Sequence, residues 1–262
     1  MPVSGAGMRR QAMRRRPIGA RLLVVFAAAL VLGGAIGGCG KGTVWSTKDE
    51  VRIGQELSKE VEHEYRVEHD TADARRVQRI GERLLAHSDE RPGVPYSFSV
   101  LDTKQVNAVS LPGGPIYVYR GLLDLVGSDT DALACIIGHE MGHINGRHIA
   151  HQYTKELELQ GLLTVLLGGK SASVQNLAGL AEELLTLKFS RDDEYEADAR
   201  GLSYAYKAGY DPNGLIRFFQ KLEVLEKQGG QEPEFLMTHP LTQARINRAR
   251  KIIESGDYRF GH

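Results

Sequence analysis

Apolar side chains recur along this chain at two spacings, one typical of helices and one typical of strands. They return every three or four residues in 53–65 and again in 77–84, which predicts two amphipathic helices. A Pro- and Gly-containing stretch, residues 91–95, interrupts this pattern. Apolar residues then alternate with serines in residues 96–100, which predicts a half-buried strand.

Four further segments complete the predicted domain. Residues 106–111 and 116–119 flank a Pro-Gly-Gly-Pro turn and are expected to form a hairpin. Residues 212–227 and 241–254 are expected to be helices that close the domain. Because helices are many and strands few, the sequence predicts an α+β fold that is mainly helical, with a small β-sheet or hairpin.

The candidate chemistry begins with the sequence His-Glu-Met-Gly-His at residues 139–143. Residues four apart share one face of a helix, so His139 and His143 can direct two imidazole nitrogens to a single zinc ion. Glu140 falls beside that ion, where it can hold and deprotonate a water molecule. The flanking residues are mostly apolar, and in a buried helix such polar groups are costly unless they are paired or bind a metal. Ser128 and Asp131 resemble a capping box at the start of this helix.

A catalytic zinc needs a third protein ligand and one position open for water. Glu194 and Asp198 are again four residues apart on an expected helix, and Glu194 could complete a His, His, Glu set. Asp198 could then accept the second ring N–H of a ligand histidine. Glu196 is the competing ligand, and a solvated acidic helix start is the other interpretation of this segment.

Several short motifs accompany these two segments: Asn107-Ala108, Leu111-Pro112-Gly113-Gly114, Gly121-Leu122-Leu123, Arg147-His148, Ser190-Arg191, Ala197-Asp198, Thr238-His239-Pro240 and Arg245-Ile246. In this combination the chain resembles the membrane-associated gluzincin peptidases, the family of HtpX, BepA, LoiP and the CAAX prenyl proteases. It most resembles the BepA/LoiP-type periplasmic lipoprotein proteases, without a TPR repeat, over about residues 49–253.

This resemblance implies a zincin-type catalytic domain that hydrolyses internal peptide bonds. It implies one Zn²⁺ per chain, held by His139, His143 and Glu194. It also implies Glu140 as the general base and Asp198 as a residue behind the ligands.

The resemblance further implies that the strand containing Asn107, Ala108 and Val109 lies beside the cleft and pairs with extended substrate. Backbone pairing would give broad specificity, since every peptide carries the same N–H and C=O groups. A simple edge strand without substrate contact is the alternative. The chain departs from many relatives at Val109-Ser110, which concerns substrate preference rather than the chemistry.

Two residues near the C-terminus carry further implications of the resemblance. His239 is expected as a removable fourth zinc ligand that keeps the enzyme latent; alternatively it caps the next helix or hydrogen-bonds a nearby carboxylate. Arg245 is expected to face the cleft and steady the oxyanion, with a surface ion pair as its alternative.

The N-terminus has the composition of a lipoprotein signal peptide. Six arginines and no acidic residue precede an apolar run at 22–32, and Ile36-Gly37-Gly38-Cys39 resembles a lipobox. We therefore expect a signal peptide at 1–38, lipid on Cys39, a tether at 39–48 and the peptidase domain at 49–262. The next residue, Gly40, is not aspartate, which favours a periplasm-facing outer-membrane location; an uncleaved anchor is the alternative.

Charge and cysteine content exclude some classes of partner. Loss of the six leader arginines leaves 27 basic against 33 acidic residues, so nucleic-acid binding is not expected. Cys135 has no predicted disulfide partner and is expected to be a small buried residue; the alternative is a role near zinc. The Leu- and Gly-rich residues 157–187 are expected either as a lid over the cleft or as core helices.

These observations favour a zinc endopeptidase of the bacterial cell envelope. From the family and the predicted location, the expected substrates are unfolded, misfolded or stalled envelope proteins, and outer-membrane assembly machinery is an expected partner. The alternative is a lipoprotein chaperone or assembly factor whose zinc site is structural. A prenyl-protein protease would need several membrane spans, which this sequence does not contain.

Overall fold

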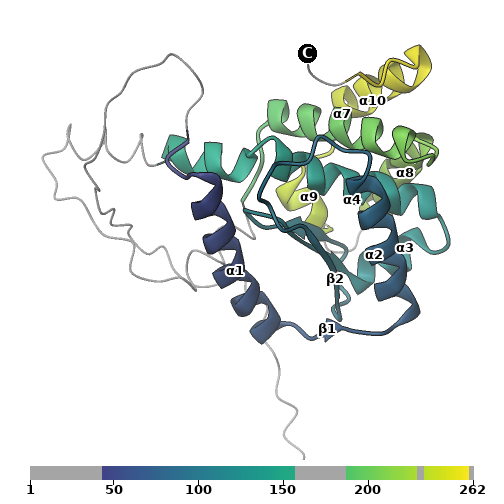
Figure 1. Ribbon diagram of the computed structural model, residues 1–262. Coiled ribbons are helices and arrows are strands. Elements are labelled where there is room, and N and C mark those ends of the chain that lie inside the picture. Colours follow the sequence, from purple (N-terminus) through teal and green to yellow (C-terminus); the bar gives the residue numbers. More distant parts are fainter. Residues whose placement is uncertain (1–42, 157–186, 229–232, 260–262) are drawn as a thin grey trace, which may run out of the picture.

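The computed structural model describes residues 43–156, 187–228 and 233–259 (Figure 1). The predicted signal peptide, the lipid site Cys39 and residues 157–186 lie outside these ranges. The helices are α1 Thr47–Glu64, α2 Ala72–Leu85, α3 Arg120–Val126, α4 Thr130–Asn145, α7 Arg191–Lys207, α8 Asn213–Lys227, α9 Glu234–Thr238 and α10 Gln243–Ser255. The strands are β1 Val67–Glu68, β2 Ser97–Leu101, β3 Ala108–Ser110 and β4 Pro115–Tyr119. Residues 148–156 are also helical.

The predicted mainly helical α+β fold is therefore confirmed. Three short elements, β1, α3 and α9, were not predicted, because runs of two to seven residues are too short to show a clear hydrophobic period. None of the helices within the described ranges is both long and apolar enough to cross a bilayer.

The four strands form one mixed sheet in the order β1-β2-β4-β3. The central strands β2 and β4 are parallel, whereas β1 and β3 pair antiparallel with their neighbours. The predicted hairpin is present as β3 and β4, with Ala108 opposite Val118 and Ser110 opposite Ile116. Consequently β3 is an edge strand of the sheet.

Alternate residues of the sheet pack into two separate cores. Ile116 and Val118 belong to the larger core with α2, α4, α7 and α8. Tyr117 and Tyr119 belong to the smaller core with α1, where Leu57 is fully buried. In Figure 1 the sheet accordingly lies between α1 on one side and α2 on the other.

Helices α4 and α7 approach each other closely because small residues line their contact. A Cβ atom on Gly201 would lie 2.7 Å from the backbone nitrogen of His139, and one on Gly142 would lie 2.9 Å from Cα of Ala197. Both distances are too short for real side-chain contacts, so these positions require glycine at this helix separation. The close approach places the acidic residues of α7 next to the histidines of α4.

Helix α4 begins one residue later than predicted. Asp129, not Ser128, is its N-cap, and the Asp129 carboxylate accepts a hydrogen bond from the backbone N–H of Ala132 at 3.0 Å. The carboxylate also forms an ion pair with Arg217 at 2.8 Å. An uncharged serine hydroxyl could not form such a pair. The start of α7 is a capping box between Ser190 and Asp193.

Candidate metal centre

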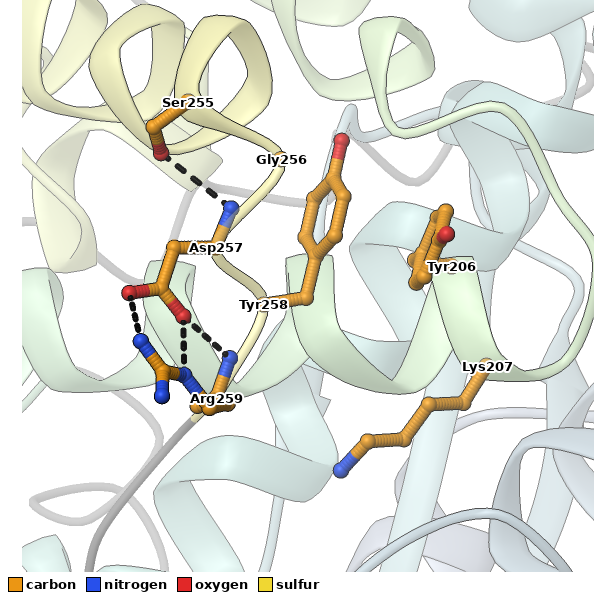
Figure 2. A pocket seen from close by; sticks show the side chains of 7 residues that line it. All are labelled: Tyr206, Lys207, Ser255, Gly256, Asp257, Tyr258 and Arg259. Carbon is orange, nitrogen blue, oxygen red and sulfur yellow. Dashed lines mark hydrogen bonds and ion pairs between the residues drawn. The ribbon is translucent and has the colours of Figure 1, made fainter.

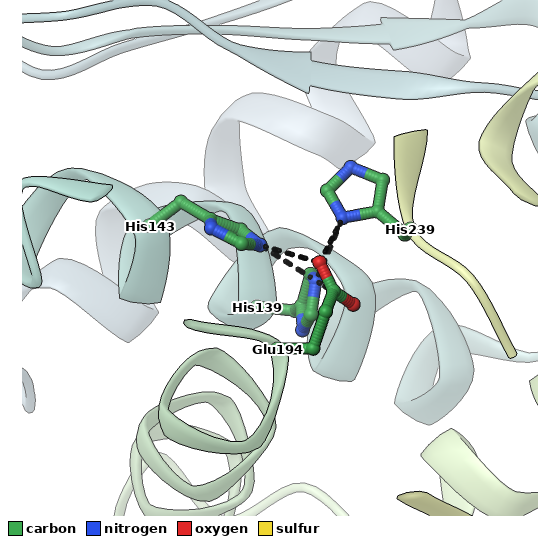
Figure 3. Close-up of side chains that lie close together, drawn as sticks. All are labelled: His139, His143, Glu194 and His239. Atoms are coloured by element: carbon green, nitrogen blue, oxygen red, sulfur yellow. Dashed lines mark hydrogen bonds and ion pairs between the residues drawn. The ribbon is translucent and has the colours of Figure 1, made fainter. Parts of the chain in front are cut away.

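Four donor groups from three helical elements converge in the interior (Figure 3). His139 and His143 come from α4, Glu194 from the first turn of α7, and His239 directly follows α9. Each of the four residues is only 1% exposed. One donor atom from each lies within 4.8 Å of the others, so the group could hold a metal ion.

The separations between donor atoms suit zinc. His139 Nε2 lies 3.0 Å from His143 Nε2 and 3.3 Å from His239 Nδ1. Glu194 Oε1 lies 3.4 Å from His143 Nε2 and 2.9 Å from His239 Nδ1. Ligands about 2.0–2.1 Å from a tetrahedral ion are about 3.3–3.4 Å apart, and the set of imidazoles and carboxylate is one that zinc prefers. The residues present therefore fit this metal.

Behind His139 stands a buried ion pair. His139 Nδ1 lies 3.0 Å from Oδ1 of Asp198, the contact expected for a carboxylate that orients a ligand histidine. Arg245 binds the same carboxylate in bidentate fashion at 2.9 and 2.8 Å and also contacts Glu194. Since Arg245 is only 2% exposed, its interpretation as a surface ion pair is wrong.

Behind His143 stands a different partner, His148. Nδ1 of His143 lies 2.9 Å from Nδ1 of His148, while Phe189 stacks on the His143 ring at 3.8 Å between centroids. Glu196 lies on the far side of His148, with its carboxylate 3.8 Å from Nε2. Glu196 is therefore outside the donor group, and its interpretation as the competing ligand is wrong. Sequence reasoning missed this contact, although His148 follows the motif at a short, fixed distance.

Glu140 lies beside the donor group and is fully buried. Neither of its carboxylate oxygens has a hydrogen-bond partner among the described residues, and the nearest cationic candidate, His239 Nε2, is 3.6 Å from Oε1. Burial raises the pKa of Glu140. An unpaired buried carboxylate is costly, so its presence here suits a group that must engage water and substrate.

The electrostatics of two donors, His143 and Glu194, favour the forms that bind metal, whereas those of His239 favour its protonated form. Burial lowers the pKa of His143 well below its ordinary value, which keeps the imidazole neutral. Burial alone would raise the pKa of Glu194, but His239 and Arg245 hold it well below its ordinary value. For His239 the pKa is raised, because Glu194 and Glu140 outweigh its burial.

The position of His239 is set by α9. Its ring stacks on Phe235 at 4.6 Å, and its backbone N–H donates to the Phe235 carbonyl at 2.8 Å. The backbone N–H of Phe235 in turn donates to the carbonyl of Val106, just before β3, at 3.0 Å. Thr242 caps α10, so the interpretation of His239 as that cap is wrong. The predicted hydrogen bond to a nearby carboxylate is present, with Glu194 as the acceptor.

The predicted substrate strand is the edge strand β3. Asn107 and Leu111 exchange backbone hydrogen bonds with β4, so alternation directs the backbone groups of Ala108 and Ser110 to the outer edge. The Asn107 side chain accepts the Ala108 N–H at 2.9 Å. Val109 packs into the core on the α1 side.

Cys135 is buried apart from the donor group. It is 1% exposed, and its sulfur lies 3.8 Å from the carbonyls of Asp211 and Pro212. Burial raises the pKa of its thiol. These contacts support the prediction of a small buried residue.

A surface hollow of about 450 Å³ lies between the end of α7 and the C-terminal segment (Figure 2). Tyr206 and Tyr258 stack there at 4.1 Å, and the carboxylate of Asp257 is held by Arg259. The residues that line the hollow include none of the four donors. It is therefore separate from the candidate metal centre.

Comparison with known proteins places this geometry in a protein family. Residues 71–253 match the profile described as "Peptidase family M48". The chain is 28% identical over 184 residues to the beta-barrel assembly-enhancing protease of Yersinia pestis, covering 66% of this chain and 37% of that protein. It is 25% identical over 225 residues to the protein of the same name from Escherichia coli K12, covering 81% of this chain and 45% of that protein. It is 38% identical over 149 residues to the mitochondrial metalloendopeptidase OMA1 of Arabidopsis thaliana, covering 56% of this chain and 30% of that protein. The chain thus spans less than half the length of these relatives.

Proposed function

The chain belongs to peptidase family M48, and we propose that it is a zinc-dependent endopeptidase of the bacterial cell envelope. One observation carries this proposal: the buried donor group lies directly beside the unpaired carboxylate of Glu140. In this proposal His139, His143 and Glu194 hold the zinc ion. A purely structural site would have no use for a costly buried carboxylate at this place.

The remaining residues of the centre have distinct roles in the proposed hydrolysis. When bound, zinc polarises the scissile carbonyl and acidifies a water molecule. Glu140 accepts a proton from the attacking water and later donates it to the leaving amine, a task that its raised pKa suits. Asp198 orients His139. The contacts of Arg245 support a positioning role through Asp198 and Glu194; its contact with an oxyanion stays a prediction from the resemblance.

We assign substrate binding to the outer edge of β3, at residues 107–109 and the adjoining Ser110. An extended peptide would pair with outward backbone groups there, next to Glu140 on α4. Part of this edge is engaged by the chain itself, since the Val106 carbonyl accepts from α9 and the Ala108 N–H donates to Asn107.

The same contacts support a latent resting state. His239 completes the four-donor group, and all four donors together with Glu140 are shielded from solvent. A substrate can reach Glu140 only after this arrangement opens, and withdrawal of His239 would free one zinc position for water. We therefore propose that His239 is a removable fourth ligand.

The location and the partners rest on the sequence and on the relatives. Two relatives are named beta-barrel assembly-enhancing proteases, which supports envelope substrates and a contact with outer-membrane assembly machinery. We propose that lipid on Cys39 anchors the chain facing the periplasm and that misfolded or stalled envelope proteins are its substrates. The alternative function, a lipoprotein chaperone with a structural zinc site, is favoured only by the presence of a fourth donor beside the other three.

Casein cleavage by the purified full-length chain tests the proposal, with zinc content measured in every variant. We compare the wild type with Glu140→Gln, His239→Ala and the double variant. Cleavage by His239→Ala that exceeds that of the wild type and is abolished by Glu140→Gln, at equal zinc content, supports both base and latency. No cleavage by either single variant or the wild type, with zinc bound, overturns the peptidase assignment and leaves the chaperone.

A further inference from the structure

The three residues that follow α4 form a turn that places the ring of His148 against His143, the proposed zinc ligand. Gly146 ends the helix, Arg147 adopts a left-handed backbone with φ of 55°, and the chain then enters the next helical segment at His148. A Cβ atom on Gly146 would lie only 2.2 Å from Nε2 of His148. Glycine at this position therefore leaves the space that the His148 ring occupies.

Ion pairs with a buried glutamate hold this turn in place. Arg147 donates from Nε to Glu50 of α1 at 2.8 Å, and Glu50 is also bound by Arg91 at 2.8 Å. The Glu50 side chain is only 3% exposed, whereas that of Arg147 is 30% exposed. The contact with Glu50, a residue distant in the sequence, stabilises the left-handed backbone conformation of Arg147.

The resulting geometry determines which ring nitrogen carries each proton. When Nε2 of His143, which faces the other donors, binds zinc, the ring proton resides on Nδ1. The 2.9 Å contact then makes Nδ1 of His148 the acceptor and leaves the N–H of His148 on Nε2, toward Glu196. Glu196 is itself bound by Arg200 at 3.0 and 2.9 Å.

We propose that His148 is a positioning residue of the zinc site: its Nδ1 accepts the N–H of His143 and fixes the tautomer and ring orientation of that ligand. The inference rests on the proposed function, in which His143 binds zinc. His148 is not one of the four donors and acts through His143. Removing the partner of a ligand histidine typically weakens metal affinity by about 10–100-fold.

A matched pair of substitutions isolates the acceptor from the shape of the side chain. His148→Asn keeps an acceptor near the position of Nδ1, whereas His148→Leu has a similar size and no acceptor. We expect His148→Leu to weaken zinc binding by about 10–100-fold and His148→Asn to stay within about 3-fold of the wild type. Zinc affinity of the full-length chain is measured by chelator competition, and the visible spectrum of the cobalt-substituted protein reports the ligand geometry.

Two further variants serve as support and control. Gly146→Ala keeps an ordinary helical backbone, with φ of −74°, but displaces the His148 ring, so it should weaken zinc binding in the same direction. His151→Leu, one turn further along, removes a histidine that does not contact the donors and should leave zinc affinity unchanged. If His148→Leu does not fold, Gly146→Ala provides the measurement.

The outcomes separate this inference from the proposed function. Wild-type affinity and cobalt spectrum in both His148→Leu and Gly146→Ala would overturn the role of His148, as would equal losses in the Asn and Leu variants. His143→Ala is measured in parallel. If it keeps wild-type zinc affinity, the proposed ligand set fails; if it alone loses zinc, only the inference about His148 fails.

Discussion

The two histidines of one motif are supported in different ways. His139 is backed directly by a carboxylate, Asp198, which a buried arginine holds in bidentate fashion. His143 is backed by another imidazole, His148, and the carboxylate beyond it, Glu196, is 38% exposed. In both arrangements a side chain lies behind a proposed ligand histidine. Only the arrangement behind His139 places a complete ion pair in the interior.

This difference arises from the positions of the two histidines on α4. Asp198 of α7 reaches His139 directly, at 3.0 Å. His143 lies one turn later, near the end of α4, where the following turn supplies the partner instead. The comparison teaches that two equivalent histidines of one motif can have different hydrogen-bond partners, because each is contacted by the segment that lies behind it.

The largest difference between the His139 side and the His143 side is expected when the supporting carboxylate of each is removed in turn. Asp198→Ala leaves Arg245 buried without its main partner, so the free energy of unfolding should fall by about 3–5 kcal/mol. Glu196→Ala removes a partly exposed group and should cost about 1 kcal/mol or less. Urea unfolding of the metal-free variants at pH 7 measures both. Equal costs would contradict the distinction between a buried and a solvated support.

Zinc removal should affect both sides alike, because the proposed ligand set includes both histidines. At a free zinc concentration 100 times the dissociation constant, binding to the folded state adds about 2.7 kcal/mol to stability. Thermal unfolding of the wild type should therefore shift to lower temperature when a chelator is added. In His139→Ala and in His143→Ala the shift should disappear. A full shift that persists in one of them would show that its histidine does not bind zinc.

Adding one methyl group between α4 and α7 should disturb the His139 side. The new Cβ of Gly201→Ala meets the backbone at His139, so the helices must separate, at a cost of about 1–3 kcal/mol. We expect a lower melting temperature and weaker zinc binding. Ala199→Ser, which adds one heavy atom at a half-buried position of the same helix, is the control and should change neither. A wild-type melting temperature for Gly201→Ala would show that the helices are not in close contact.

The smallest effect is expected at the start of α4, remote from both histidines. Hydrogen bonds from Arg217 and the Ala132 N–H lower the pKa of Asp129 below its ordinary value of 3.8. The unfolded chain therefore binds this proton more readily, so the contribution is full above about pH 4 and is lost as the pH falls through the folded pKa. Asp129→Ala should cost about 0.5–2 kcal/mol at pH 7 and progressively less below pH 4, without a change in zinc affinity. A cost that is independent of pH would contradict the charged cap.

Local spacing made much of the site predictable from the sequence. His139, His143, Glu194 and Asp198 follow the four-residue rule of a helix, and the structure brings them together as expected. The same rule predicted the long helices, because each has enough residues to show its period, and the Pro-Gly-Gly-Pro turn predicted the hairpin.

The remaining features depend on contacts between distant segments, which no local pattern reports. The bidentate pair of Arg245 with Asp198 joins residues 47 positions apart, and a surface pair was an equally valid interpretation before the fold was known. The place of His239 came from family resemblance rather than from spacing. The start of α4 was misplaced by one residue, because Ser128 and Asp129 are both good caps and only the contact with Arg217 distinguishes them.

The glycine-lined contact between α4 and α7 also has a consequence for how the sequence can vary. Backbone lies directly against backbone there, so the helices hold each other through their own residues, while His148 and Phe189 of the connecting segment contact His143. Chain closure depends only weakly on length, since each doubling of a flexible connection costs about 0.6 kcal/mol. An insertion between residues 156 and 187 should therefore leave the spacing of the donors constant, as long as His148 and Phe189 keep their contacts with His143. Such a centre permits new binding surfaces to be inserted beside it without redesign of its chemistry.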